Sequence, residues 1–478
     1  MNRRIPSLMR IGVRAIVLLV ATSPAAAVTA ISLEEVLASS REHFPRVQSA
    51  VAEILAQQGR VTEALGAFDL ALEQESLIWA DGYYDGVSTD SKLVKPVGPA
   101  NAKLFAGYRV SNDDFPIYQQ ELVTNDGGEF NLGIVFSMWR DRATDARRVA
   151  VDNARLGVRE ARIELRLARL MTQRNAARAY WRWLAAGREL AVYRQLAALA
   201  EKRMDGLDQR VAAGDVAAIF VVENRQNLLR RQALVTSAER DFRLAAIELS
   251  LYLRDHEGRP RRALETELPD AFPDADLEIE DPQSLVDSVL ARRPELALLD
   301  VDRARGENSL KLAENLLKPR VDVGFKAAQD LGDGSRAREG FDAIVDVTIS
   351  IPLERRRALG QADSARAKLR RLEFDRQLQS ERLTNELAKL GVTIDAARRF
   401  VAISRDEAAQ ADIMERAERR RFDAGASDFF VVNLREERSA DARLRNLQAT
   451  LGYFVGLVDY YATIVDLDAL GLHPDTEF

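Results

Sequence analysis

The chain has 478 residues, of which 47% are apolar and 30% charged, so it can bury a core and is not a disordered chain. Its formal net charge of -6 argues against nucleic acid as a partner, because proteins that bind nucleic acid gather Lys and Arg. It has no Cys, which excludes disulfides, a thiol nucleophile and a lipid linked to an N-terminal Cys.

Residues 1–30 have the pattern of a signal peptide. Three arginines accompany the short, largely apolar run 11–20, and small residues suited to cleavage follow it. We expect cleavage near Ala27 or Ala30. Because no later apolar run reaches the about 18 residues of a membrane-spanning helix, the exported chain is expected to be periplasmic, secreted or an outer-membrane β-protein.

The mature sequence repeats its own plan. Segments 31–74 and 282–326 each predict a short helix and then a longer helix that begins near a proline, Pro45 in the first and Pro294 in the second. Each of these segments then leads into a β-like stretch. The chain is therefore expected to consist of two structurally similar halves.

Alternating apolar residues predict strands at 130–138, 321–327 and 343–351. Together with the β-like end of the first segment, this gives two strands in each half. The Pro-rich segment 82–128 is expected to be irregular and exposed, as an extracellular loop, although the alternation at 104–110 leaves a further strand open.

A very long helix follows the strands in each half, at 146–211 and 361–422, with apolar residues three and four apart. About 65 helical residues extend over roughly 100 Å. Each helix ends at an Ala-Gly pair, and Gly suits the left-handed conformation that ends helices. Return helices are predicted at 217–253 and 429–464, so each half contains an antiparallel helical hairpin.

The fold class is therefore mostly α, with the order helix, strand, strand and long helical hairpin present twice. The predicted division is a signal peptide at 1–30, a first repeat at 31–253, a linker at 254–281, a second repeat at 282–470 and a tail at 471–478. Four strands cannot close a membrane barrel, since the smallest known have about eight, and an open sheet edge is not stable in lipid. Strands that enter a membrane would thus require several copies of the chain.

This duplicated plan resembles the TolC family of outer-membrane efflux proteins over roughly residues 31–470. The segments that carry the resemblance are 213–222, 318–323, 350–353 and 424–433. The resemblance implies a homotrimer in outer-membrane lipid, with one shared twelve-stranded barrel and a periplasmic helical barrel. It also implies a passive export conduit for tripartite efflux or type I secretion, whose partners are a periplasmic adaptor (membrane fusion) protein and an inner-membrane transporter.

The resemblance further implies a closable periplasmic end at the tips of the hairpins. Well-known members carry acidic residues one and two turns beyond the second Gly, where this chain has Val431 and Leu434, so other polar residues would have to serve. The candidate gate residues are Gly214, Gly425, Ser427, Asp428 and Asn433.

Aromatic residues flank the strands and are candidates for a girdle at the membrane interface, although ordinary strand aromatics explain them equally well. They are Trp79, Tyr83, Tyr84, Tyr108 and Trp139.

No catalytic, cofactor or metal site is predicted. His43, His256 and His473 are far apart and lack a metal-ligand spacing, and no nucleotide-binding or nucleophile motif is present. A rival to the conduit is a periplasmic coiled-coil scaffold or adaptor without a barrel. Two hairpins in tandem favour the conduit, since adaptors usually have one.

Overall fold

A computed structural model describes residues 30–472 of the chain, apart from 82, 113–114 and 276–279. The predicted signal peptide lies outside the described residues except for Ala30, and so does the predicted tail after Leu472. The division into two repeats and a linker stays a prediction.

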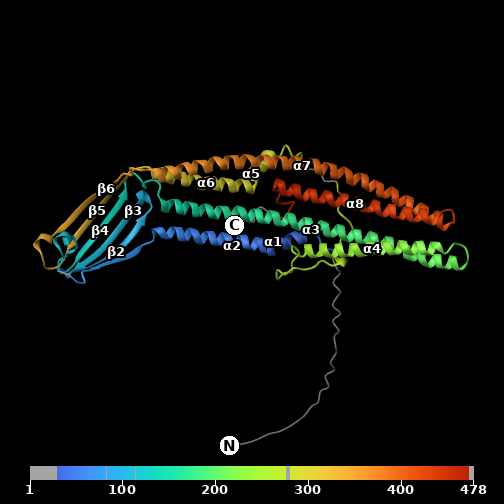
Figure 1. Cartoon of the computed structure of the whole chain (residues 1–478), viewed down its shortest axis with the longest axis horizontal. Coiled ribbons are helices and arrows are strands. Elements are labelled where there is room, and N and C mark those ends of the chain that lie inside the picture. Colours follow the sequence, from blue (N-terminus) through green and yellow to red (C-terminus); the bar gives the residue numbers. More distant parts are fainter. Residues whose placement is uncertain (1–29, 82, 113–114, 276–279, 473–478) are drawn as a thin grey trace, which may run out of the picture.

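The molecule is elongated, with a β-sheet at one end from which long helices extend (Figure 1). Its helices are α1 Leu33–His43, α2 Pro45–Leu65, α3 Ala146–Ala212, α4 Ile219–Leu249, α5 Val286–Arg292, α6 Pro294–Asn315, α7 Arg356–Asp423 and α8 Phe429–Ile464. Its strands are β1 Ala71–Ile78, β2 Val87–Val97, β3 Ala102–Ser111, β4 Glu129–Ser137, β5 Arg320–Asp330 and β6 Phe341–Ser350.

The two predicted helical hairpins are confirmed. Helix α3 has 67 residues and turns into α4, and α7 has 68 residues and turns into α8. Each long helix is flanked by two shorter ones in succession, α2 and then α4 beside α3, and α6 and then α8 beside α7 (Figure 1). Helix α7 begins five residues before the predicted start at 361, because Gly360 is accommodated within its first turns.

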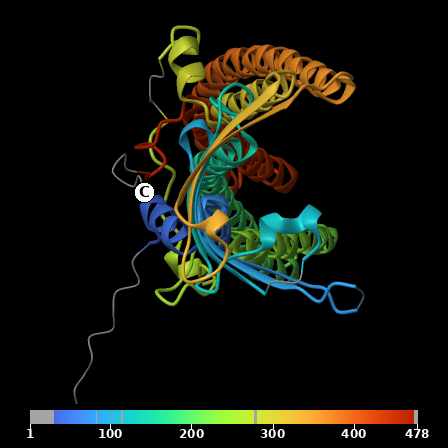
Figure 2. The ribbon, with the colours of Figure 1, turned by 90° about the vertical axis from the view of Figure 1, so that its left-hand side faces the viewer.

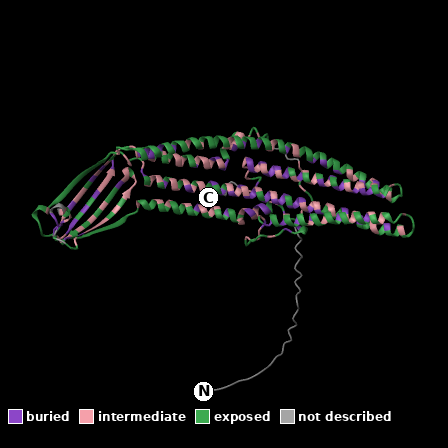
Figure 3. Ribbon diagram, in the orientation of Figure 1, coloured by how far each residue is buried: buried purple, intermediate pink, exposed green. Residues whose placement is uncertain are grey.

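The main core lies around the middle of α3, where α1, α4 and α8 pack against it. Trp183 of α3 is fully buried there, and the ring of Trp181 stacks on Phe454 of α8 with centroids 4.4 Å apart. The Tyr180 hydroxyl donates a hydrogen bond of 3.1 Å to the carbonyl of Ile31. Burial is concentrated in this region, whereas the outer strands β1 and β6 of the sheet are wholly exposed (Figure 3).

The sheet has six strands in the order β1-β2-β3-β4-β5-β6, and every neighbouring pair is antiparallel. The expectation of two strands in each half is therefore wrong for the first half, which contributes four. The segment 82–128 holds β2 and β3 where an irregular loop was predicted, and the alternation at 104–110 is confirmed as a strand. Seen from its end, the sheet is a curved wall that does not close (Figure 2).

Pro96 explains why β2 is difficult to predict. Proline lacks the N–H that a strand between two neighbours normally donates, so it argues against an inner strand. In the structure β1 pairs with β2 only as far as Val94, and Pro96 pairs with β3 alone, opposite Lys103. A tight turn then follows, with Ala100 and Asn101 at φ values of 54° and 51°, and connects β2 to β3.

Candidate functional site

The two faces of the sheet differ in chemistry. Residues paired across all six strands form rows, and adjacent rows point to opposite faces. One row is wholly apolar and consists of Leu72, Leu93, Ala106, Leu132, Ala327 and Ala343. The adjacent row is mainly polar and consists of Glu73, Lys92, Gly107, Asn131, Ala328 and Asp342. We call the face with the first row the apolar face and the other the polar face.

The apolar face is uncovered. Of the large apolar side chains that are exposed on the strands, 14 lie on this face and only Leu77 and Ile344 lie on the other. Those on the apolar face are Leu72, Ile78, Val87, Leu93, Leu104, Tyr108, Val110, Phe130, Leu132, Phe325, Phe341, Val345, Val347 and Ile349. A patch of this extent marks a surface that contacts a protein or a lipid, since single soluble chains rarely expose one.

The polar face carries charges that pair across the strands. Glu129 of β4 accepts hydrogen bonds from Arg109 of β3 at 2.5 Å and from Lys326 of β5 at 3.1 Å. Asp322 of β5 accepts from Arg320 at 2.6 Å and from the Ser137 hydroxyl at 2.8 Å. This pattern of apolar and polar faces is the one found in the walls of outer-membrane barrels, whose interior is polar.

Three of the predicted interface aromatics gather at the end of the sheet that lies away from the helices. The Trp79 indole N–H donates to Gln119 Oε1 at 3.0 Å, and its ring meets that of Tyr84 edge-on at 6.4 Å. Tyr108 packs on Phe130 with ring centroids 4.8 Å apart.

The other two aromatics lie at opposite ends of the sheet. Tyr83 projects from the connection after β1 and is 91% exposed, although its ring touches Tyr84. Trp139 follows β4 at the helical end of the sheet and is 57% exposed. The candidates therefore mark both ends of the sheet, and their role at a membrane interface stays a prediction.

Gly214 and Gly425 form equivalent turns at the tips of the two hairpins. Their φ values are 77° and 73°, in the left-handed region that favours glycine. After Gly214 the N–H of Asp215 donates to the carbonyl of Arg210 at 2.9 Å, and after Gly425 the N–H of Ala426 donates to Arg421 at 2.8 Å. Both are the Schellman arrangement that closes the end of a helix.

Two other candidate gate residues have local structural partners at the second tip. Asp428 is the N-cap of α8, and its side chain accepts a hydrogen bond of 3.2 Å from the N–H of Phe430. The Ser427 hydroxyl donates to the carboxylate of Glu418 on α7. These contacts hold the turn in place, and a part in gating remains a prediction for both residues.

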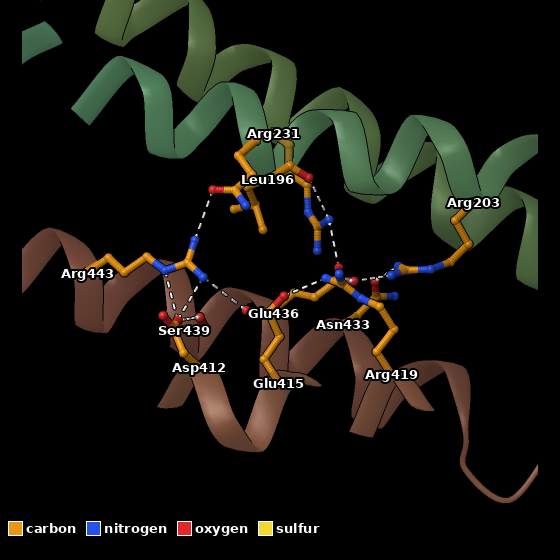
Figure 4. A network of polar contacts seen from close by, with 11 residues as sticks. Leu196, Arg203, Arg231, Asp412, Glu415, Arg419, Asn433, Glu436, Ser439 and Arg443 are labelled. Atoms are coloured by element: carbon orange, nitrogen blue, oxygen red, sulfur yellow. Dashed lines mark hydrogen bonds and ion pairs between the residues drawn. The ribbon is translucent and has the colours of Figure 1, made fainter. Parts of the chain in front are cut away.

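Asn433 belongs to a buried polar cluster that joins the two hairpins (Figure 4). Its side-chain oxygen accepts from Arg203 of α3, which also pairs with Glu436 of α8. Glu436 is 1% exposed and receives a second ion pair of 3.0 Å from Arg231 of α4. Arg419 of α7 approaches the same carboxylate at 3.5 Å.

The cluster extends along α8 towards the middle of the molecule. Arg443 pairs with Asp412 of α7 at 2.8 Å, and the Ser439 hydroxyl donates to the same carboxylate at 2.6 Å (Figure 4). Arg231 also donates to the carbonyl of Leu196 on α3 at 2.9 Å. One carboxylate on the second hairpin is thus bound by arginines from both helices of the first.

Burial and charge oppose each other at Arg231. Burial lowers the pKa of this guanidinium, while Glu436 raises it. Arg231 therefore depends on Glu436 to remain a stable buried cation, because a buried charge without a partner is strongly unfavourable. The predictions from sequence missed this pair. The only indication in the sequence is that Glu436 lies four residues from Val432 and from Ala440, which occupy the buried stripe of α8.

The described residues lack two other kinds of functional feature. In the ranges between 30 and 472 that the structure describes, no three His, Asp or Glu side chains gather in a way that could hold a metal ion. Among those residues, no helix combines the length and the apolar character needed to cross a membrane.

Comparison with known proteins identifies the architecture. No family model matches the sequence, and no curated protein matches it either. The Campylobacter jejuni CmeC outer membrane channel is 11% identical with a TM-score of 0.65, over 93% of this chain and 90% of that chain. The open-state Neisseria gonorrhoeae MtrE outer membrane channel is 13% identical with a TM-score of 0.65, over 90% and 88%.

The Vibrio cholerae outer membrane protein VceC is 15% identical, covers 90% of this chain and 95% of that chain, and has a TM-score of 0.62. The chain has the TolC-like fold. The resemblance inferred from the duplicated sequence plan is therefore confirmed for the fold, although the sequences have diverged widely.

Proposed function

We propose that this protein is the outer-membrane duct of a tripartite efflux or type I secretion system. Three copies of the chain share one barrel in the outer membrane and one helical tube in the periplasm. The tube receives cargo from an inner-membrane transporter through a periplasmic adaptor protein. The chain itself supplies a passive path and performs no chemical reaction.

The observation that carries this proposal is the pair of unlike faces on an unclosed sheet. The apolar face suits lipid, and the charged polar face suits a water-filled interior. Free strand edges cannot remain unpaired in lipid, because their backbone groups would lack hydrogen bonds. A shared barrel of several copies meets both requirements.

The helical hairpins support the proposed tube in the periplasm. A helix of 67 residues is on the order of 100 Å long, which would carry the duct far from the membrane. The hairpin tips would then form the periplasmic end, where the cluster around Glu436 joins the two hairpins of each subunit. Opening of this end requires the two hairpins to separate or slide, and the cluster opposes that movement.

The periplasmic scaffold or adaptor is the weaker alternative. An adaptor without a barrel has no need of a sheet with 14 exposed large apolar side chains on one face. Such a face would promote aggregation in the aqueous periplasm.

The proposal is tested by the native mass of the particle extracted from purified outer membranes in detergent. We expect a trimer that is found in the outer-membrane fraction and forms ion-conducting pores in planar bilayers. A monomer or dimer released with the periplasmic contents would overturn the proposal and favour the scaffold.

A further inference from the structure

The number of strands in the sheet determines the size of the barrel that the copies would share. The sheet is a simple meander in which β1 pairs only with β2, and β6 only with β5, among the described residues. The TolC family resemblance implies four strands from each subunit, and this chain has six. The additional hairpin is β2 and β3, inserted in the first half alone.

The additional hairpin has the properties of barrel wall. Strand β2 pairs with β3 over ten consecutive residue pairs, from Ser88 and Ser111 to Val97 and Ala102. The apolar row that starts at Leu72 and ends at Ala343 crosses β2 and β3 without a polar residue. The hairpin thus continues the curved wall and does not lie over it.

The strands also have the right length. They contain 8 to 11 residues, and a tilted strand needs about 9 to 11 to cross a membrane. Strands β2 and β3, with 11 and 10 residues, are as long as β5 and β6. Length therefore gives no reason to exclude the additional hairpin from the wall.

The free edges are compatible with each other. Strand β1 leads away from the helices, and β6 leads back to them, so β6 of one copy beside β1 of the next continues the antiparallel order. All residues of both strands are exposed in the single chain. Each edge therefore has a free row of backbone groups for a second copy of this chain.

We propose that β6 of each subunit pairs with β1 of the next, so that three copies close an eighteen-stranded barrel. The proposal rests on the trimeric duct proposed above. Six strands from each of three copies give eighteen. Because barrel diameter grows roughly in proportion to strand number, this barrel is about one and a half times as wide as one of twelve strands.

The competing arrangement keeps twelve strands by folding the β1–β2 hairpin out of the wall, which would leave β3 at the edge. It breaks the ten pairs between β2 and β3. It would also remove the exposed Leu93 of β2 from the apolar face of the wall. The two arrangements differ in the strand that meets β6 of the neighbouring copy.

Engineered disulfides distinguish the two arrangements, because the chain has no Cys of its own. One cysteine is placed on β6, as Ala343→Cys, Val345→Cys or Val347→Cys. The second is placed on β1, as Leu72→Cys, Gln74→Cys or Ser76→Cys. The matched set replaces the second cysteine by Leu104→Cys, Ala106→Cys or Tyr108→Cys on β3. All of these positions lie on the apolar face.

We expect disulfide-linked subunits on non-reducing gels for pairs between β6 and β1, and none for pairs between β6 and β3. Trimers linked through β3, or trimers with no link to β1 in any of the nine combinations, would overturn the eighteen-stranded barrel. Failure to recover any outer-membrane trimer without engineered cysteines would instead contradict the proposed duct. The two proposals thus fail by different results.

Labelling provides a second test of the additional hairpin. In intact outer membranes, Ser91→Cys and Leu93→Cys on β2 should resist a hydrophilic maleimide, because they face lipid. Lys92→Cys and Val94→Cys, on the polar face of the same strand, should react with it. Equal labelling at all four positions would show that β2 is outside the wall and would overturn the proposal.

Discussion

Arg231 and Glu436 form an ion pair of 3.0 Å although 205 residues separate them in sequence. Arg231 is on the first helical hairpin and Glu436 on the second, and both are only 1% exposed. The pair therefore connects the two halves of the chain near the end that the proposed function assigns to opening and closing.

Loss of the carboxylate should weaken this connection. Glu436→Gln leaves the partly buried Arg203 without a negative partner and the buried Arg231 with only Glu437, which is 4.0 Å away. Breaking such a buried pair costs about 3–5 kcal/mol. We expect a lower thermal midpoint by circular dichroism and a higher single-channel conductance in planar bilayers. Arg231→Met should have a smaller effect, since Glu436 retains Arg203.

Glu407→Gln is the matched control for this prediction. Glu407 pairs with Arg445 between α7 and α8, but both side chains are about half exposed. We expect neither the midpoint nor the conductance to change, because surface ion pairs contribute little. Equal effects of Glu407→Gln and Glu436→Gln would contradict a special role for the buried pair.

Substitution by alanine should destabilise the protein at the glycines of the hairpin tips and stabilise it at a glycine within a helix. Gly425→Ala and Gly214→Ala each place a Cβ at positive φ, which costs about 1–2 kcal/mol. Gly206→Ala, within α3 and with open space around it, should stabilise by about 0.5–1 kcal/mol. Gly425→Pro should disturb the tip most, since proline fixes φ near about −65°. Unfolding by heat ranks the variants, and a stabilised Gly425→Ala would contradict the turn.

Asp428 has a structural role that can be separated from its charge. Asp428→Ala removes the N-cap of α8 and should cost about 1 kcal/mol, whereas Asp428→Asn retains the cap. Reversal potentials in a salt gradient report whether the charge also lines the duct. An equal shift of cation preference in both variants would support a gate role, and no shift in either would exclude it.

Opposite faces of β6 should respond differently to the same charge. Val347→Arg puts the charge on the apolar face, where it costs up to about 2–4 kcal/mol in the middle of a bilayer. Thr348→Arg puts it on the polar face, opposite Asp322, and should be tolerated. The measurement is the amount of folded protein in the outer membrane. Similar yields for both variants would argue against lipid at the apolar face.

The carboxyl of Glu189 in the core region should make stability depend on pH. Burial, and then Asp241, raise the pKa of this group. The folded state thus favours the protonated form, so charged Glu189 destabilises the fold above the raised pKa, and the penalty disappears as pH falls through it. We expect Glu189→Gln to raise the free energy of unfolding at pH 7–8 by less than about 1 kcal/mol, given its partial exposure.

This gain should disappear in acid. It should also be smaller in an Asp241→Asn background, where one cause of the raised pKa is removed. Thermal unfolding of the four proteins at pH 8 and pH 4 measures both effects. A gain that persists unchanged at pH 4 would show that packing of the glutamine, and not ionisation, is responsible.

The long helices and most of the strands could be predicted, because the spacing of apolar residues along the chain indicates where each one lies. The predicted 146–211 and 429–464 agree with α3 and α8 to within a residue, since apolar spacing defines both helices and Gly214 follows the end of α3. Strand β2 could not be predicted, because Pro96 is acceptable only where β1 has already ended. The point at which β1 ends beside β2 depends on the register between the two strands. No local sequence pattern gives that register.

The candidate site likewise contains residues that the sequence could predict and residues that it could not. The turns at Gly214 and Gly425 follow from single residues and their neighbours, and both are present. The cluster around Glu436 depends on how two distant hairpins pack. A glutamate at a buried helical position indicates that a cation must be near, but several arginines could serve, and only the packed structure selects Arg203 and Arg231.

The meander restricts how a duct of this kind can evolve. Every hairpin of the sheet leaves the helical end and returns to it, so strands are gained or lost in twos. In the trimer proposed above, each such event changes the number of strands in the whole barrel by six. The pore of that trimer therefore widens in large steps, while each subunit keeps its two helical hairpins, α3–α4 and α7–α8. Lineages of such ducts should fall into discrete size classes, with no intermediates between them.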